Sequence, residues 1–426
     1  MLTTGTPARN WAGNITFGAA RSHRPSTIDE LRRVVATARS VRVLGAGHSF
    51  SDIADTTEDQ VRLDGLPRRV EIDQDAAIVT VGGGLRYADF CAEVHAAGFA
   101  LPNLASLPHI TVAGAVATGT HGSGNEQRGL AGSVAAIELI GPDGDPLRLS
   151  RAEDPEHFAG AVVNLGALGP VTALTLDLEP AYDVAQWVYT GVPLDAVAAE
   201  FDDITGAGHS VSVFTDWRGG EGGIWLKRRV DRHGAGHPGA DWHGGRLAET
   251  AIHPIPGMPP ETCTPQLGVP GPWYDRLPHF RLAFFQREGD EIQSELFLPR
   301  TAVREAFAAL RELGDRIAPL LYVSEVRTIA ADELWLSPAQ GRDSVAFHFT
   351  WHRRPEAVLE VVAAIEERLL PLGARPHWGK VTAAAPAVVV AGYERFADFR
   401  RLVLDHDPEG RFRNAYVSRL LDAAPR

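Results

Sequence analysis

Cysteine is almost missing from this sequence, which contains only Cys91 and Cys263 among 426 residues. Two thiols exclude a scaffold stapled by disulfides, and they are too few for a zinc or iron–sulfur site built from cysteine. Positive charge is also scarce, because 41 basic residues face 54 acidic ones and give a formal net charge of −13. This excess of negative charge argues against a nucleic-acid partner.

Long apolar runs are absent as well. Residues 1–21 do not combine a basic start with an apolar stretch, so the sequence predicts no signal peptide. The longest stretch without a formally charged residue, 94–125, is interrupted by prolines and glycines and cannot form a spanning helix. We therefore expect a cytoplasmic protein without a membrane partner, and we expect a monomer.

The rest of the composition is that of an ordinary globular protein. Hydrophobic residues make up 44% and charged residues 22% of the chain, and a chain of this length can bury a large core. At about 150 residues per domain, the length predicts two to three domains. Only Lys227 and Lys380 among the 41 basic residues are lysines. This arginine bias is typical of GC-rich coding sequences and favours a bacterial source, and it makes both lysines candidates for a special role.

Periodicity predicts two regions of mixed helix and strand. The first region has one helix at 86–97 and strands at 41–46, 69–74, 76–82, 133–141 and 168–178. After about residue 181 the pattern predicts helices at 301–314 and 356–370 and strands at 184–191, 209–217, 223–228, 279–285, 291–298, 319–329 and 344–351. The elements do not alternate as in a doubly wound sheet, so the predicted fold class is α+β with two domains. Residues 231–277, rich in Gly, Pro and His, are interpreted as a long irregular connection and a candidate functional loop.

Several familiar motifs are not satisfied. Three glycine clusters, which begin at Gly45, Gly82 and Gly122, lack the third glycine of the dinucleotide fingerprint. The pair Gly379-Lys380 continues with valine, so it is no phosphate loop. Neither H-E-x-x-H nor G-x-S-x-G occurs. These absences argue against an NAD-dependent dehydrogenase, a kinase and a serine hydrolase.

A glycine loop follows the predicted strand 41–46 and carries one histidine, His48. Glycines let a backbone approach a ligand closely, adopt positive φ and expose N–H groups that hold anions. The pattern alone is compatible with a ligand loop or a plain turn, because Gly206–Ser210 repeats the same five residues. A second small-residue run, Thr118–Gly124, ends a long uncharged region that either wraps a large ligand or forms a buried loop.

Four ordered blocks between residues 45 and 180 give these loops a family resemblance. GAGHSFSD, GGGLRYAD, LPNLASLPHITVAGAVATGTHGSG and NLGALGPVTALTLDLEP resemble the FAD domain of the vanillyl-alcohol-oxidase type of flavoprotein. The resemblance implies FAD bonded covalently through its 8α-methyl to His48, and a neutral imidazole is a suitable nucleophile near neutral pH. The FAD-binding residues that it implies are Val43, Leu44, Gly45, Ala46, Gly47, His48, Ser49, Phe50, Ser106, Leu107, Thr111, Gly114, Thr118, Gly119, Thr120, His121, Gly122, Val171, His377 and Asn414.

Two predicted strands of the second region carry polar side chains on one face. In 344–351 (SVAFHFTW) the valine and the aromatic residues share a face that must be core, so His348 and Thr350 point elsewhere. In 321–329 (LYVSEVRTI), Glu325 and Arg327 share a face with aliphatic neighbours. This arrangement indicates either a closed polar site or a plain ion pair.

The element RPHWGK places Lys380 beside an aromatic residue and a glycine, either as a cation near a ligand or as a solvated lysine. VSEVRT, HFTW, PHWGK and RFRNAYV are similar to the substrate domain and C-terminal segment of alditol oxidases, and PHW-x-K also recurs in sugar-lactone oxidases. The resemblance implies an FAD-binding domain at 1–182, a substrate domain with a helix-covered antiparallel sheet at 183–380, and a segment at 381–426 that returns to the first domain. Residues 231–260 match no part of it, so the resemblance implies nothing about this loop or about how the substrate enters.

The same resemblance implies the reaction and the residues that perform it. A primary hydroxyl of a small polyol, such as xylitol or sorbitol, is oxidised to the aldose by hydride transfer to FAD, and O₂ is reduced to H₂O₂. Arg327 and Lys380 stabilise negative charge that develops on the reacting hydroxyl, while His348 orients its neighbours or helps to move the proton. The residues implied to bind the polyol are Ser106, Glu325, Arg327, Thr350 and Lys380.

Three other functions remain open at this point. An aldonolactone oxidase or dehydrogenase, of the gulono- or galactono-lactone type, would use an equally polar site, although VSEVRT and HFTW favour open-chain alditols. A non-catalytic carbohydrate-binding protein would use the glycine loops as plain turns. A histidine-based metal hydrolase is compatible with 16 histidines, but no ligand spacing supports it, so no metal site is predicted.

Overall fold

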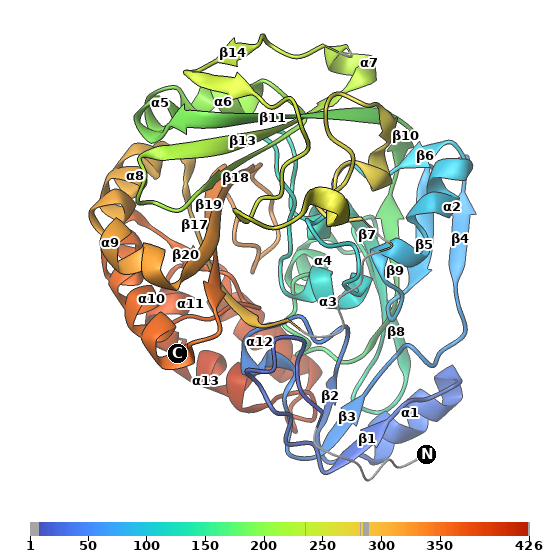
Figure 1. The fold of residues 1–426 in the computed structure, drawn as a ribbon. Coiled ribbons are helices and arrows are strands. Elements are labelled where there is room, and N and C mark those ends of the chain that lie inside the picture. Colours follow the sequence, from blue (N-terminus) through green and yellow to red (C-terminus); the bar gives the residue numbers. More distant parts are fainter. Residues whose placement is uncertain (1–7, 235, 282, 284–288, 425–426) are drawn as a thin grey trace.

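The residues nearest the N-terminus build a small parallel sheet at one end of the molecule (Figure 1). The structure is a computed structural model that describes residues 8–234, 236–281, 283 and 289–424. Helix α1 (Ile28–Thr37) joins the first strand to the second and packs on this sheet. The strand order is β1 (Arg21–His23), β3 (Asp59–Val61) and β2 (Val41–Val43).

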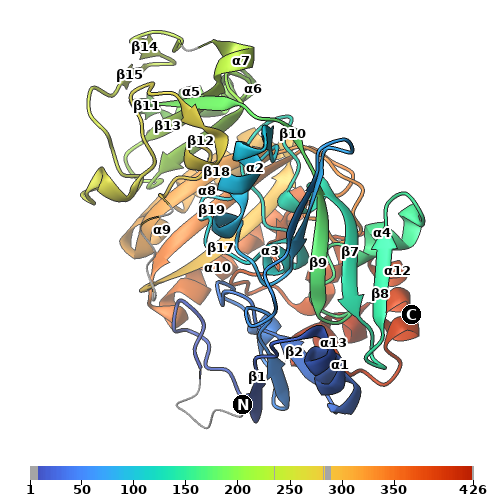
Figure 2. The same ribbon diagram turned by 90° about the vertical axis from the view of Figure 1, so that its right-hand side faces the viewer.

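A second sheet of five antiparallel strands follows, with three short helices around it. Its order is β4 (Val70–Asp73), β5 (Ile78–Gly82), β9 (Val171–Asp177), β7 (Val134–Ile140) and β8 (Pro146–Ser150). A separate ladder joins β6 (Phe99–Ala100) to β10 (Glu179–Pro180). The helices are α2 (Cys91–Ala96), α3 (Val112–Ala117) and α4 (Pro155–Ala161). Helix α3 lies between this sheet and the largest sheet in both ribbon views (Figures 1 and 2).

The largest sheet of the described chain has ten strands, and all its pairs are antiparallel. Along one path its strands are β14 (Asp241–Trp242), β15 (Gly245–Leu247), β11 (Asp183–Pro193), β13 (Glu221–Arg229), β12 (Ser210–Thr215), β18 (Leu321–Ile329), β19 (Ser344–His352), β17 (Glu291–Pro299) and β20 (Arg375–Pro376). The tenth strand, β16 (Gly271–Pro272), pairs with β11.

One face of this sheet is covered by helices and forms a hydrophobic core (Figure 1). Val345, Phe347, Phe349 and Trp351 of β19 are all 0% exposed and belong to that core. The period-two prediction for this strand is therefore confirmed, because alternate side chains of a strand point to opposite faces. The covering helices are α5 (Leu194–Ala199), α6 (Phe201–Gly206), α8 (Val303–Glu312), α9 (Gly314–Ile317) and α10 (Pro355–Leu369).

The C-terminal helices pack beside the first part of the chain rather than on the largest sheet (Figure 1). These helices are α11 (Pro386–Ala391), α12 (Phe396–His406) and α13 (Ala415–Ala423). Their apolar side chains share a core with residues of the five-stranded sheet and of α4. The division of the chain at residues 182 and 380 stays a prediction.

Most predicted strands are present, with ends shifted by a few residues. The strand predicted at 41–46 already ends at Val43, because the glycine loop begins there. The helix predicted at 86–97 is split into a 3₁₀ turn and α2. The prediction of a strand at 279–285 is wrong for residues 279–281, where only Phe280 forms an isolated bridge, and residues 282, 284 and 285 lie outside the described residues.

The segment 231–277 is mostly irregular, as predicted, but it also contains the short helix α7 (Val230–His233) and the strands β14, β15 and β16. Short 3₁₀ turns occur along the chain at Asp52–Ala54, Tyr87–Asp89, Leu130–Ser133, Pro260–Thr262, Trp273–Asp275, Arg300–Ala302, Ala318–Leu320 and Leu370–Leu372. Within the described ranges, no helix is both long enough and apolar enough to cross a bilayer.

Candidate active site

A single large cavity of about 1610 Å³ connects the glycine loops to the polar face of the largest sheet. Most ligand pockets measure about 300–1,000 Å³, so this cavity exceeds what a small polyol needs. It has room for a large cofactor and a small substrate together. Residues 253–255 and 258–259, from the long irregular segment, also line it, which places part of the loop predicted to be functional at the cavity.

The loop that carries His48 is held close to its neighbours by glycines. Gly47 has a φ of +72°, in the left-handed region that favours glycine. A Cβ on Gly45 would lie 2.3 Å from Oγ1 of Thr111, so only glycine lets the two segments approach this closely. The backbone N–H of Phe50 donates to the carbonyl of Gly379 at 2.7 Å, which ties the loop to the segment that carries Lys380.

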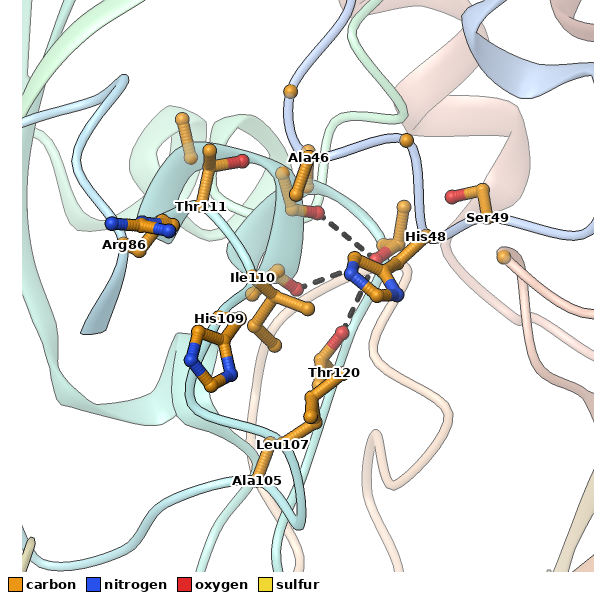
Figure 3. A pocket seen from close by; sticks show the side chains of 18 of the residues that line it. Ala46, His48, Ser49, Arg86, Ala105, Leu107, His109, Ile110, Thr111 and Thr120 are labelled. Carbon is orange, nitrogen blue, oxygen red and sulfur yellow. Dashed lines mark hydrogen bonds between the residues drawn. The ribbon is translucent and has the colours of Figure 1, made fainter. Parts of the chain in front are cut away.

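His48 projects from this loop toward the segment that carries Ile110 and Thr111 (Figure 3). Its ring stacks on Trp11, with centroids 5.0 Å apart. Burial, together with the nearby Lys380 and His109, lowers the pKa of His48 to about 4. The imidazole is therefore neutral at pH 7.

The Nε2 atom of His48 is buried and has no hydrogen-bond partner within the described chain. A buried polar atom without a partner costs about 1–3 kcal/mol, so the site is incomplete as a purely structural arrangement. A neutral nitrogen that faces a large cavity fits the attachment of a cofactor ring. FAD therefore fits this end of the cavity.

The second glycine-rich segment forms another wall of the same cavity. Oγ1 of Thr118 donates to the carbonyl of Gly114 at 3.0 Å and lies 3.3 Å from Oγ1 of Thr120. These contacts stabilise the turn after α3 without any charged side chain. The predicted FAD-binding residues that line the cavity are Val43, Leu44, Gly45, Ala46, Gly47, His48, Ser49, Phe50, Ser106, Leu107, Thr111, Gly114, Thr118, Thr120, His121, Val171 and His377.

Three predicted FAD-binding residues lie outside the cavity lining. A Cβ on Gly119 would contact Pro338 at 2.8 Å, and one on Gly122 would contact Asn103 at 2.3 Å, so both glycines allow close packing within the protein. Asn414 caps α13 and donates through Nδ2 to three carbonyls of the turn at 52–55. Each of the three therefore has a packing or capping role within the protein, and its contact with the cofactor stays a prediction.

Arg327 is the centre of the polar wall on the largest sheet. Its Nη2 donates to Oε1 of Glu295 at 2.6 Å, and its Nε lies 3.5 Å from Oε2 of Glu325. Its Nη1 donates to Oγ of Ser106 at 3.4 Å, which links the wall to the uncharged loop. All four side chains line the cavity. The alternative of a plain cross-face ion pair therefore does not describe this cluster, which encloses a polar site.

The strand register explains how the two carboxylates come together. His348 on β19 is the direct partner of Glu325 on β18 and of Glu295 on β17. Residues that are directly opposite in neighbouring strands have side chains on the same face. The three polar groups therefore form a row across the sheet, on the face opposite the aromatic core.

Lys380 lies at the edge of this row. Its Nζ donates to Oε1 of Gln293 and lies 5.1 Å from the centroid of the Phe50 ring. The Nε2–H of His348 donates to the same amide oxygen at 3.1 Å, because a carbonyl oxygen only accepts. The alternative of a solvated surface lysine is thus excluded, since Lys380 lines the cavity with Thr350 and these partners.

Burial and charge together set the protonation of this wall. Burial favours the neutral form of Glu295 and Glu325, but Arg327 and the neighbouring histidines outweigh it and hold both pKa values below their ordinary range. Burial lowers the pKa of Lys380 to about 8 and that of His348 to about 3. At pH 7 the wall therefore holds two carboxylates, two cations and a neutral His348.

Sequence reasoning missed several members of the wall, which come mainly from β17. Gln293 and Glu295 alternate along 291–298 with Ile292 and Leu296, and the two apolar residues lie in the core. This period-two pattern was a usable signal for a polar face. His279 gave no such signal, because it lies in an irregular segment and reaches Glu325 through a contact far apart in sequence.

Comparisons with known proteins match both halves of the chain. Residues 20–150 match the family described as FAD binding domain, and residues 282–420 match the family described as D-arabinono-1,4-lactone oxidase. An alditol oxidase from Streptomyces sp. (strain IKD472 / FERM P-14339) is 51% identical over 421 residues, which cover 98% of this chain and 99% of that protein.

More distant relatives share nearly the whole length. An L-gulonolactone oxidase from Mus musculus is 25% identical and covers 98% of each chain. An L-gulono-1,4-lactone dehydrogenase from Mycobacterium tuberculosis is 27% identical over 97% of this chain and 98% of that protein. The crystal structure of cholesterol oxidase from B. sterolicum superimposes with a TM-score of 0.80 over 99% of this chain and 97% of that chain, at 14% identity. This last likeness shows the fold alone.

The predicted fold class is confirmed, because the largest sheet is antiparallel, residues 20–150 match the FAD binding domain, and the cholesterol oxidase structure shares the fold over nearly the whole chain. The predicted FAD cofactor agrees with the match to the FAD binding domain. With 51% identity to one relative over almost its full length, this chain belongs to the alditol oxidase family, within the FAD-dependent oxidoreductases of the vanillyl-alcohol-oxidase type.

Proposed function

We propose that this chain oxidises a primary hydroxyl of alditols such as xylitol and sorbitol to the aldose. The observation that carries the proposal is one cavity that holds both an unpartnered imidazole nitrogen among glycine loops and two cations beside two carboxylates. When bound, FAD supplies a hydride acceptor that O₂ reoxidises with formation of H₂O₂. The residues that would hold FAD are His48, through a covalent bond, and the glycine loops around it.

Arg327 and Lys380 lower the cost of removing the hydroxyl proton, which is released to solvent and balanced by the proton taken up when O₂ is reduced to H₂O₂. An alcohol is about as acidic as water, whose pKa is roughly 15.7, so alkoxide does not form unaided at neutral pH. Preorganised cations in a site that excludes water stabilise the negative charge as it develops. Both side chains line the cavity and are held in place by Glu295 and Gln293 respectively.

His348 acts as an orienting residue in this proposal. Because burial lowers its pKa to about 3, the ring binds a proton too weakly to be an effective base at pH 7. Its Nε2–H donates to the amide oxygen of Gln293 that also accepts from Lys380. The ring therefore fixes the acceptor that positions the lysine.

Recognition of the polyol depends on polar groups that need partners. Glu325, Ser106 and Thr350 line the cavity beside Arg327 and bind the hydroxyls that do not react. Each hydrogen bond contributes about 0.5–1.5 kcal/mol net, so four or five give micromolar-to-millimolar binding at best. The cytoplasmic location and the monomeric state stay predictions.

We expect kcat/KM for xylitol to exceed that for L-gulono-1,4-lactone and that for pentane-1,5-diol at least 100-fold. Pentane-1,5-diol keeps the primary hydroxyls but lacks the inner ones, so it leaves Glu325 and Thr350 without partners, and such sites discriminate strongly. The measurement is H₂O₂ release under air for all three compounds. Faster turnover of the lactone would favour the aldonolactone oxidase alternative, and a colourless protein would favour a carbohydrate-binding function.

We expect the yellow colour of the purified protein to stay in the pellet after acid precipitation. A covalent bond to His48 survives denaturation, whereas a cofactor held by hydrogen bonds and packing is released. In His48→Ala the colour should appear in the supernatant, and in the control His109→Ala it should stay in the pellet. His109 lines the same cavity and bears a second imidazole. Colour in the supernatant of the wild-type protein would contradict the covalent bond.

A further inference from the structure

Lys227 is the second lysine of the chain, and it lies behind the cavity wall without lining the cavity. It sits on β13 and is 1% exposed. Its Nζ donates to the carbonyls of Leu277 and Pro278 at 2.5 and 3.1 Å and faces Nδ1 of His279 at 3.3 Å. Three acceptors thus meet the three protons of the ammonium group, and none of them carries a formal charge.

The contacts at its two ring nitrogens determine where His279 carries its proton. Burial lowers the pKa of Lys227 to about 7, and below that pH the ammonium only donates, so Nδ1 accepts. In a neutral ring the proton is then on Nε2, where the ionised Glu325 can only accept it. Burial, with Lys227 beside it, lowers the pKa of His279 to about 4, so the ring is neutral. Nε2 lies 2.8 Å from Oε1 of Glu325. The chain of donors therefore runs from Lys227 through His279 to the carboxylate.

Glu325 is held from two sides by this arrangement. His279 donates to Oε1, and Arg327 approaches Oε2 at 3.5 Å. The backbone N–H of His279 also donates to the carbonyl of Ser106 at 3.1 Å, so the same residue orders the loop that bears a predicted substrate ligand. A shift in the tautomer of His279 would turn a lone pair toward the carboxylate and displace it.

We propose that Lys227 is a positioning residue for polyol recognition, which donates to Nδ1 of His279, keeps that ring neutral with its single proton aimed at Glu325, and thereby fixes the orientation of the carboxylate. This inference rests on the proposed function, because Glu325 is there the group that binds a hydroxyl of the substrate. It assigns a role to a buried cation that touches neither the cavity nor the reacting atoms.

The competing explanation is that Lys227 only ties the segment 277–279 to the sheet. Thr264 provides a matched control, because its Oγ1 donates to the carbonyl of Pro278 at 2.7 Å and its backbone N–H donates to that of His279 at 2.9 Å. Its side chain is likewise buried, but it makes no contact with the imidazole nitrogens of His279 in the described structure. Thr264→Val therefore loosens the same segment without changing the tautomer.

The kinetic test compares Lys227→Met with Thr264→Val in the FAD-loaded enzyme. We expect Lys227→Met to raise KM for xylitol at least 10-fold with kcat within about threefold of wild type, and Thr264→Val to leave both within about threefold. In a His279→Gln background, Lys227→Met should not raise KM further, because the effects of substitutions do not add when the two residues contact each other and act through the same interaction. Equal effects of the two single variants, or additive effects in the double variant, would overturn the proposal.

A spectroscopic test separates this inference from the proposed function. In protein with ¹⁵N-labelled histidine, the His279 signals are those that disappear in His279→Gln, and their nitrogen shifts report the tautomer. At about pH 6, where Lys227 is charged, we expect a neutral ring with its proton on Nε2 in wild type and Thr264→Val. In Lys227→Met we expect Nδ1 to be protonated as well, because the carbonyls of Leu277 and Pro278 lose their donor while Glu325 still accepts from Nε2. A wild-type ring with its proton on Nδ1 would overturn the inference even if xylitol is oxidised. An expected tautomer without xylitol turnover would instead contradict the proposed function.

Discussion

Arg327→Ala is expected to lower kcat for xylitol at least 100-fold while the protein stays yellow. A 100-fold change corresponds to about 2.7 kcal/mol of lost transition-state stabilisation, and loss of one preorganised charge-stabilising group commonly costs this much. The guanidinium of Arg327 donates to Glu295 and Ser106 and forms an ion pair with Glu325 at the cavity. The measurement is steady-state H₂O₂ release per bound FAD, so that protein without cofactor does not count.

Loss of stability is the main alternative cause of such a result, because Arg327→Ala leaves two buried carboxylates without their cation. Arg229→Ala is a matched control. Arg229 is also a buried arginine between two carboxylates, Glu179 and Asp231, but it does not line the cavity. We expect it to lower the melting temperature and to keep kcat within about threefold of wild type. Near-normal kcat in Arg327→Ala would remove its role at the reacting hydroxyl.

The polar wall was predictable from sequence where a single strand carries its own pattern. In β19 the aromatic residues alternate with His348 and Thr350, and burial of one face then directs the other toward a site. The same reasoning paired Glu325 with Arg327 on β18. Such predictions need only the period of a strand, and they do not depend on which strands are neighbours.

The partners of these residues were not predictable, because strand order and register are long-range properties. Glu295 faces Arg327 only because β17 and β18 both flank β19 and all three are in register at His348. His279 comes from an irregular segment, whose path no periodicity describes. One sequence without pairing information gives the polar face of each strand but not the ion pairs between strands.

The resemblance to flavoproteins located the glycine loops, but it did not separate residues that line the cavity from residues that pack within the protein. Within a motif such as 118–124, some small residues face the cavity while others, such as Gly119 and Gly122, are small because protein atoms lie against them. A sequence pattern records that a position must be small, and it does not record which neighbour requires it.

Lys380→Met is expected to lower kcat at least 100-fold, because methionine has similar length and volume but no charge. Lys380 donates to Gln293 and lies at the cavity beside the other cation. Lys380→Arg keeps a positive charge and should still provide most of the stabilisation of negative charge on the developing alkoxide. Its planar group does not, however, reproduce the lysine geometry. Both variants should keep the yellow colour, since His48 is unchanged. Turnover within threefold of wild type in Lys380→Met would remove the lysine from the mechanism.

The dependence of kcat on pH provides an independent test of the same role. Burial lowers the pKa of Lys380 to about 8, with Glu295 opposing and Arg327 adding to the decrease. The ammonium is charged below this pH and neutral above it, so wild-type kcat should fall as pH rises through about 8. Burial keeps the pKa of His48 and of His348 at about 4 and 3, far from this range. In Lys380→Arg the decrease should vanish, because a guanidinium stays charged throughout. An unchanged alkaline decrease in Lys380→Arg would assign that titration to another group and would contradict charge stabilisation by Lys380.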